Sequence, residues 1–342
     1  MEILKLFWGK RSDGTWEIQG MSPISLSNDK AKDKNFYLIQ DDICHAQPNH
    51  IGTIKSFLGQ SIVPIVAHVP GESILRCLGT GFFISCTGLL ITAAHVITDP
   101  IERQYGGVKE RDDNSWDLGE LKMGVMIPLN PVFQGDGYIF RDIEWASFLA
   151  ERSENPLPIS GVDLKLTSDT AICKVLPLGD EIPHQPLSIV QKGLIGLGMS
   201  VGKAATTIGY ADMHDVELTQ VQDGVLSGDF KFNLHVSTGK IIERFTDNFE
   251  TKSVPAPGAC FSASLKLPGG MSGSPIFDDE RIYVHGVVSK GWEDENGPTD
   301  FGFGSMLAYS LNLPIKLMED KTLIDLMKNN EHGISKLSIP DA

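Results

Sequence analysis

A formal net charge of −15, from 29 lysines and arginines against 44 aspartates and glutamates in 342 residues, sets the first limits on function. Nucleic-acid phosphates and anionic membranes are bound by clustered Lys and Arg, so this balance argues against both as partners. The 35 glycines and 19 prolines suit a turn-rich, all-β protein, and the length allows two domain-sized units or one large double barrel.

Residues 1–60 are expected to form an N-terminal extension ahead of the main domain. The extension begins with a short apolar run broken by Lys5, which predicts neither a signal peptide nor a membrane span. Two apolar runs flank an Asp-Gly turn within residues 5–18 and predict a hairpin, followed by a polar loop over residues 22–35 and a strand at residues 36–39. We expect the extension either to pack on the main domain or to dock a regulatory protein partner.

The main domain is expected at residues 61–325, where short apolar runs alternate with Gly, Pro, Asn and Asp. This spacing favours antiparallel barrels, the first at about residues 61–178 and the second at about residues 190–312. Apolar residues at helical spacing predict a short helix at residues 323–328, with its end and a polar tail over residues 326–342. The predicted fold class is therefore all-β, with two antiparallel β-barrels, an N-terminal extension and a short C-terminal helix.

Cysteine and histidine usage gives no sign of a disulfide framework or a metal centre. The five cysteines are odd in number and lie mostly in apolar, strand-like segments: Cys44, Cys77, Cys86, Cys173 and Cys260. This usage is typical of buried, reduced thiols in a cytoplasmic protein. The nine histidines include no pair with each other or with cysteine at zinc-ligand spacing, so neither a metal nor a cofactor is expected.

A glycine-rich turn from Pro268 to Pro275 contains Ser272 and leads into an apolar strand. Attack of a serine on an amide carbonyl creates an oxyanion. A tight glycine turn lets backbone N–H groups converge on that charge, here those of Gly270 and Ser272. Octets rich in Gly and Ser are more often ordinary turns, so this prediction of a catalytic serine needs support from elsewhere in the chain.

That support comes from a histidine and an aspartate. Two predicted strands, at residues 79–85 and 88–94, meet at a turn and run into His95, whose imidazole has the right pKa to take a proton from a serine hydroxyl. Asp169 begins another apolar strand and could accept the imidazole N–H and fix its tautomer. Asp163 and Asp142 are alternative orienting carboxylates, although neither begins so clear a strand.

Together these segments resemble the trypsin/chymotrypsin-like serine peptidases, which use the order His, Asp, Ser. The resemblance rests on Thr92-Ala93-Ala94-His95, on Asp169 with the hydrophobic run after it, and on residues 270–275. It covers roughly residues 61–325 and implies a double β-barrel with the triad in the cleft between the barrels. Ser289, in Gly-Val-Val-Ser, is similar to the cleft serine that hydrogen-bonds the catalytic aspartate in this family.

Three positions depart from the pattern of the digestive trypsins. Met271 stands where those enzymes carry an aspartate that pairs with a newly cut N-terminus, so the trypsin-type zymogen switch is missing. Thr80 and Val96 occupy the places of the two cysteines that form a disulfide beside the histidine. The block Gly-Met-Ser-Gly-Ser-Pro is more similar to that of glutamyl endopeptidases and Deg-type proteases.

The resemblance implies a serine endopeptidase that cleaves a protein or peptide substrate. An extended peptide is expected to pair with the strand edge formed by Ser289, Lys290 and Gly291. The family position at the base of the primary pocket corresponds to Lys266, six residues before the nucleophile. Lys266 and Lys290 would place two ammonium groups near one pocket, which would favour an acidic side chain before the scissile bond. An aliphatic or small side chain is the alternative.

Activity inside a cell requires restraint, so we expect an enzyme that is latent or narrowly specific. The alternative is a catalytically silent or partner-activated module that uses the protease fold for binding. The intact set of His95, Asp169 and Ser272 counts against a silent protein.

Overall fold

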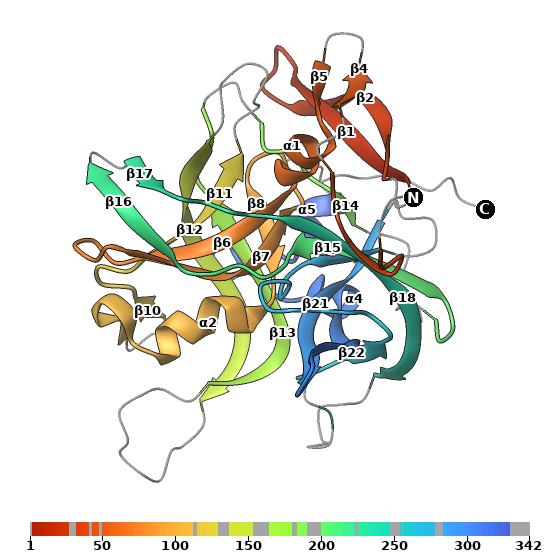
Figure 1. Ribbon diagram of the computed structural model, residues 1–342. Coiled ribbons are helices and arrows are strands. Elements are labelled where there is room, and N and C mark those ends of the chain that lie inside the picture. Colours follow the sequence, from red (N-terminus) through yellow and green to blue (C-terminus); the bar gives the residue numbers. More distant parts are fainter. Residues whose placement is uncertain are drawn as a thin grey trace.

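The computed structural model describes residues 2–26, 32–40, 43–47, 50–111, 115–128, 137–152, 164–179, 183–189, 200–222, 225–246, 254, 256–277 and 283–328. Two closed, six-stranded antiparallel β-barrels lie side by side, and the hairpins of the N-terminal extension lie above them in the view of Figure 1. The fold class expected from the sequence is confirmed: the chain is mostly strand, in the arrangement of the chymotrypsin-like double barrel.

The first barrel closes because its two outermost strands, β7 and β8, also pair with each other. In order around the barrel, its strands are β7 (Ile74–Phe83), β6 (Ile62–His68), β11 (Lys122–Pro128), β12 (Tyr138–Arg152), β13 (Leu164–Val175) and β8 (Leu89–Thr92). All residues of β6 and β8 are buried, as expected for apolar runs that face a filled interior. Helix α2 (Ala94–Glu102) follows β8 directly, so the end of that strand fixes where the helix begins.

The second barrel is closed in the same way by pairing between β21 and β22. In order, its strands are β21 (Tyr283–Asp294), β20 (Pro275–Phe277), β15 (Ala204–Tyr210), β18 (Leu234–Phe245), β19 (Cys260–Ala263) and β22 (Gly297–Met306). The two-residue β14 (Ser188–Ile189) adds a parallel pairing to β21. The largest cluster of buried apolar side chains fills the first barrel and continues onto strands of the second.

Two connections tie the barrels and the extension together across long stretches of sequence. The hairpin of β16 (Val216–Gln222) and β17 (Val225–Gly228) follows the first strand of the second barrel, yet it pairs with β7 of the first barrel. In the extension, β3 (Phe36–Leu38) pairs with β18 of the second barrel. The extension is therefore joined to the second barrel by a sheet.

The rest of the extension is two hairpins and a short helix. Strands β1 (Glu2–Lys10) and β2 (Trp16–Ser25) pair antiparallel, so β2 continues into residues expected to begin a polar loop. Strands β4 (Ile43–Gln47) and β5 (His50–Thr53) form the second hairpin, which leads into α1 (Ile54–Gly59). The side chain of Thr53 accepts the N–H of Ser56, and the Ser56 hydroxyl accepts the N–H of Thr53, so the helix start is capped from both sides.

The remaining elements are short and lie outside the barrels. They are η1 (Tyr105–Gly107), β9 (Lys109–Glu110), β10 (Trp116–Asp117), α4 (Leu307–Ser310), η2 (Lys316–Met318) and α5 (Leu323–Lys328). Helix α5 lies where the apolar spacing predicts a helix, whereas the predicted tail from residue 329 lies outside the described residues. Within the described part of the chain, no helix has the length and apolar character needed to cross a membrane.

Four of the five cysteine side chains are described, and none of these four forms a disulfide: Cys77, Cys86, Cys173 and Cys260. Burial raises the pKa of the Cys77 and Cys86 thiols to about 12, so both are protonated at neutral pH. The side chain of Cys44 lies outside the described residues. The expectation of buried thiols therefore fits Cys86, Cys173 and Cys260, whereas Cys77 is only partly buried.

Candidate active site

His95 and Asp169 are brought together by the pairing of β8 with β13. Thr92, the last residue of β8, lies opposite Ala171, so Asp169 lies two residues along β13, beside the first turn of α2. The His95 ring nitrogen Nδ1 lies 2.8 Å from Oδ2 and 3.0 Å from Oδ1 of Asp169. The backbone N–H of His95 also donates to Oδ1, at 3.0 Å, so the carboxylate fixes both the ring and the start of the helix.

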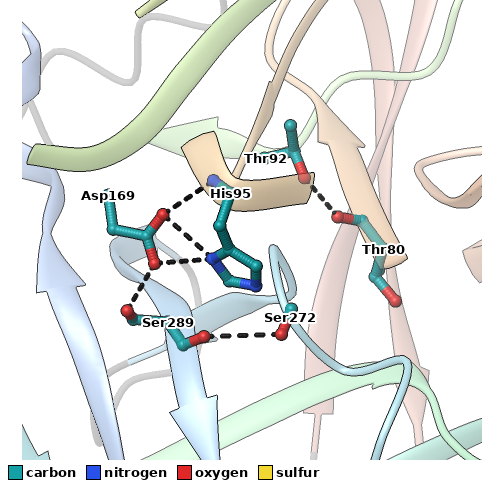
Figure 2. Close-up of polar contacts among 6 residues, drawn as sticks. All are labelled: Thr80, Thr92, His95, Asp169, Ser272 and Ser289. Atoms are coloured by element: carbon teal, nitrogen blue, oxygen red, sulfur yellow. Dashed lines mark hydrogen bonds and ion pairs between the residues drawn. The ribbon is translucent and has the colours of Figure 1, made fainter. Parts of the chain in front are cut away.

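Ser289 completes the surroundings of the carboxylate. Its hydroxyl donates to Oδ2 of Asp169 at 2.5 Å, as Figure 2 shows. Asp169 is 2% exposed, and burial alone would raise its pKa, but the attraction of His95 and the hydrogen bonds from His95 and Ser289 lower that pKa overall. Burial also acts to lower the pKa of His95, and the Asp169 charge and hydrogen bond outweigh it and raise that pKa.

Ser272 lies across the His95 ring from Asp169 (Figure 2), and all three residues line one cleft. Its hydroxyl donates to the backbone carbonyl of Ser289 at 3.4 Å, and within the described residues no hydrogen bond joins it to the His95 ring. Catalytic hydrogen bonds are often long or turned aside in a free enzyme and tighten when substrate binds.

The turn that contains Ser272 has two backbone N–H groups without an acceptor among the described residues. Gly270 has a φ of +92°, which favours glycine, and a Cβ at this position would lie 2.8 Å from the Tyr210 carbonyl oxygen. The carbonyl of Gly269 accepts the N–H of Asp212 at 2.9 Å, and because a peptide is planar and trans, the N–H of Gly270 points the opposite way. Among the described residues, neither this N–H nor that of Ser272 has an acceptor.

The cleft has a volume of about 470 Å³ and is mainly apolar. Besides the residues already named, its lining includes Leu166, Pro257, Leu267, Pro268, Val288, Lys290, Gly291 and Glu293. Ser289, Lys290 and Gly291, which the sequence predicts to form a peptide-binding edge, all line this cleft. The pairing of β21 with β20 ends at Val287. The next residue of β21, Val288, exchanges backbone hydrogen bonds with Gly273 and Ser274, the two residues that follow Ser272.

The predicted place of Lys266 at the base of the pocket is wrong. Lys266 is not among the residues that line the cleft, and its ammonium nitrogen lies 5.4 Å from the centre of the Phe36 ring, against the extension. Its neighbour Leu267 lines the cleft and is 4% exposed. A Cβ at Gly302 would collide with Cδ1 of Leu267, and a Cβ at Gly291 would collide with the Leu267 carbonyl.

Leu267 therefore lines the cleft where it packs against the paired glycines Gly291 and Gly302. Alternation along the chain carries the signal that would have identified it: Ala263, Leu265 and Leu267 are buried, whereas Ser264 and Lys266 are less so. Successive side chains of an extended segment point to opposite faces, so Lys266 and Leu267 cannot both face the cleft. Glu293 was also missed, because its place at the cleft depends on the path of β21.

Of the two alternative orienting carboxylates, Asp142 does not join the site. It lies in β12 opposite Gly124, and its backbone carbonyl accepts the N–H of Leu176. Asp163 lies outside the described residues. Within the part of the chain that is described, no group of three or more His, Cys, Asp or Glu side chains is arranged to hold a metal ion.

Sequence comparison places the chain in a family. The trypsin-like peptidase domain matches residues 79–287, a span that includes the His95, Asp169 and Ser272 positions. The chain belongs to the trypsin-like peptidase family, and its double barrel is the fold of serine proteases. No curated protein sequence matches the chain.

Several solved protease structures are similar to this chain at low sequence identity. The HtrA-type protease AlgW, solved with a decapeptide, is 12% identical over 74% of this chain and 63% of its own, with a TM-score of 0.40. Rv3671c of M. tuberculosis H37Rv is 17% identical over 78% of this chain and 91% of its own, with a TM-score of 0.38. Deg5 is 15% identical over 73% of this chain and 85% of its own, with a TM-score of 0.40. The chain thus spans less than two thirds of AlgW.

Proposed function

We propose that this chain is a serine endopeptidase that hydrolyses peptide bonds through Ser272, His95 and Asp169. The observation that carries the proposal is the buried Asp169 carboxylate held 2.8 Å from Nδ1 of His95, with Ser272 on the other side of the ring. An imidazole so oriented presents Nε2 to the serine as a proton acceptor. The unpaired N–H groups of Gly270 and Ser272 supply donors for the oxyanion.

The proposed reaction proceeds in two halves. Ser272 Oγ attacks the scissile carbonyl carbon as its proton passes to Nε2 of His95, and the electron pair of the carbonyl moves onto its oxygen between the two N–H groups. The tetrahedral intermediate collapses as His95 returns the proton to the leaving amine, which leaves an ester on Ser272. Water then attacks this ester with His95 again as base, and the acid product leaves. Asp169 stays ionised and stabilises the imidazolium.

We propose that the side chain before the scissile bond is small or aliphatic. The support is the apolar lining of the cleft and Leu267, which fills the space over Gly291 and Gly302. A long side chain would have to displace Leu267. An acidic side chain would lose water in a mainly apolar cleft, where Lys290 is the one lysine or arginine among the described lining residues. The acidic preference drawn from two lysines is therefore replaced by its alternative. The main chain of the peptide would pair with the free edge from Ser289 to Gly291.

We also propose that the enzyme works in the cytoplasm, where a protein partner restrains or activates it through residues 1–60. The cysteine usage supports the compartment. The Phe36 ring stacks on His235 and lies beneath Lys266, six residues before the nucleophile, so the extension contacts the segment that leads into the active turn. The measurement is the rate at which an active-site probe labels Phe36→Ala against the wild type. Equal rates would remove this link.

A fluorophosphonate probe tests the proposed activity, because it reacts covalently with an activated serine. We expect the wild type to be labelled, either alone or in cell extract, and Ser272→Ala to remain unlabelled. Mass spectrometry of a peptide library cleaved by the wild type, with the Ser272→Ala protein as control, then identifies the bonds cut. A folded wild type that is labelled in neither setting would overturn the proposal in favour of a binding module.

A further inference from the structure

Thr80, a fully buried residue of β7 in the first barrel, contacts the active turn of the second barrel with both its backbone and its side chain. Its hydroxyl donates to the Gly270 carbonyl at 2.8 Å, and its backbone N–H donates to the Ser272 carbonyl at 2.8 Å. The same hydroxyl accepts the N–H of Tyr210 at 3.1 Å. The Thr80 carbonyl accepts the hydroxyl of Thr92 at 2.7 Å, as Figure 2 shows.

These contacts fix the two peptide units on either side of the Met271–Ser272 peptide, whose N–H faces the developing oxyanion. The Met271 carbonyl is held by the N–H of Ser274 at 3.0 Å, and the Gly269 carbonyl by the N–H of Asp212 at 2.9 Å. Four consecutive carbonyls, from residue 269 to residue 272, are thus each hydrogen-bonded. The N–H of Met271 donates to the Pro268 carbonyl and the N–H of Gly273 to the Val288 carbonyl, so within residues 270–273 the N–H groups of Gly270 and Ser272 are left for a new acceptor.

We infer that Thr80 is a positioning residue, which holds the oxyanion-binding turn in its reactive shape before substrate arrives. This inference rests on the proposed protease activity. Thr80 itself touches no substrate, because it lies behind the turn at the junction of the two barrels. Its hydroxyl donates to the Gly270 carbonyl and accepts the N–H of Tyr210, the last residue of β15, so one hydroxyl links the turn to that strand. The expected correspondence of Thr80 with a disulfide cysteine is wrong: a Cβ at Gly79 would lie 2.6 Å from Cγ2 of Val96, so Gly79 is the residue that faces Val96, and Thr80 faces the turn.

Thr80→Val separates this role from simple filling of space, because valine has nearly the same shape and lacks the hydroxyl. It leaves the Gly270 carbonyl and the Tyr210 N–H without their partner, in a region that water does not reach. Loss of one oxyanion donor lowers kcat by about 10²- to 10³-fold, and a donor that is merely less well held should cost less. We therefore expect kcat to fall by about 10- to 100-fold, with KM within about twofold of the wild type, because ground-state binding does not use the turn's N–H groups.

The experiment compares four proteins on one cleaved peptide: wild type, Thr80→Val, Thr80→Ser and Thr207→Val. Thr80→Ser keeps the hydroxyl and should restore kcat to within about threefold of the wild type. Thr207 is a matched control, because it is also fully buried and its hydroxyl donates to the Pro275 carbonyl at 2.9 Å. Thr207→Val should lower the melting temperature as Thr80→Val does, and leave kcat within about threefold of the wild type.

A peptide aldehyde that forms a hemiacetal with the serine gives a second measurement, since its oxygen occupies the oxyanion position. Its affinity should weaken in Thr80→Val by the same factor as kcat. The inference is overturned if Thr80→Val keeps full kcat and aldehyde affinity, or if Thr80→Ser is as slow as Thr80→Val. If Thr80→Val does not fold, Thr80→Cys replaces it, and a thiol, as the weaker donor, must give an intermediate kcat. Equal turnover by the wild type and Ser272→Ala would instead refute the proposed activity itself.

Discussion

Replacing Leu267 with alanine should enlarge the base of the cleft and change which peptide bonds are cut. The side chain of Leu267 is 4% exposed and fills the space over Gly291 and Gly302. Alanine removes three carbons there, and each buried CH₂ is worth about 0.8 kcal/mol. A substrate side chain that fills the new space should gain about 2 kcal/mol in the transition state, or about 30-fold in kcat/KM relative to alanine at the same position. The free energy of unfolding should fall by about 2–5 kcal/mol.

The assay is kcat/KM for matched peptides that differ only in having Ala, Val, Leu, Phe, Glu or Lys before the scissile bond. The wild type should prefer Ala, Val or Leu, and Leu267→Ala should shift the ratio of Phe to Ala upward. Lys266→Ala is the matched control. The Lys266 side chain is next to Leu267 in sequence but lies over Phe36, outside the cleft, so its removal should not change the selectivity. An unchanged Phe to Ala ratio in a folded Leu267→Ala protein would refute the assignment of Leu267 to the base of the pocket.

Three further predictions concern the proposed triad. His95→Ala and Ser272→Ala should each lower kcat by about 10⁴-fold or more. Because the residues act as a unit, the double variant should lose no more kcat than the slower single variant. A loss equal to the product of the two single losses would contradict this. Asp169→Asn should cost about 10⁴-fold by presenting the wrong imidazole tautomer, and the matched Asp142→Asn should be near wild type, so the reverse ranking would misplace the orienting role. Wild-type kcat/KM should rise with pH around the pKa of His95, which lies above its ordinary value of 6.5, because only the neutral ring accepts a proton. A midpoint of this rise below pH 6.5 would show that burial outweighs the Asp169 charge.

Local sequence was sufficient to locate the parts of the site that depend on one strand or one turn. His95 follows an apolar strand, Asp169 lies in another and Ser272 lies in a glycine-rich turn, and the pairing of β8 with β13 brings the first two within 2.8 Å. The position of Ser289 beside Asp169 was implied by the family resemblance rather than by local sequence, and its hydroxyl donates to that carboxylate.

Long-range pairing and side-chain direction could not be obtained from the same patterns. The pairing of β3 with β18, and of β16 with β7, joins segments whose local sequences carry no sign of each other. Lys266 was placed by counting back from Ser272, which assumes that the turn has a fixed length and shape. The alternation that buries Leu265 and Leu267 determines instead that Lys266 faces the extension. The charge of Lys266 suggested a role in the pocket, whereas the buried residue that lines the cleft is Leu267.

The active turn of this protein is held by groups that do not titrate near neutral pH. Met271 is fully buried in an apolar cluster of the second barrel, at the position where digestive trypsins use a carboxylate. The carbonyls of the turn are bound by the Thr80 hydroxyl and by backbone N–H groups, all neutral donors. The shape of this turn therefore follows from packing the two barrels together and requires no ionised partner. Among these groups, only the His95–Asp169 pair couples catalysis to pH, so the acid limb of the rate should follow one ionisation, that of His95.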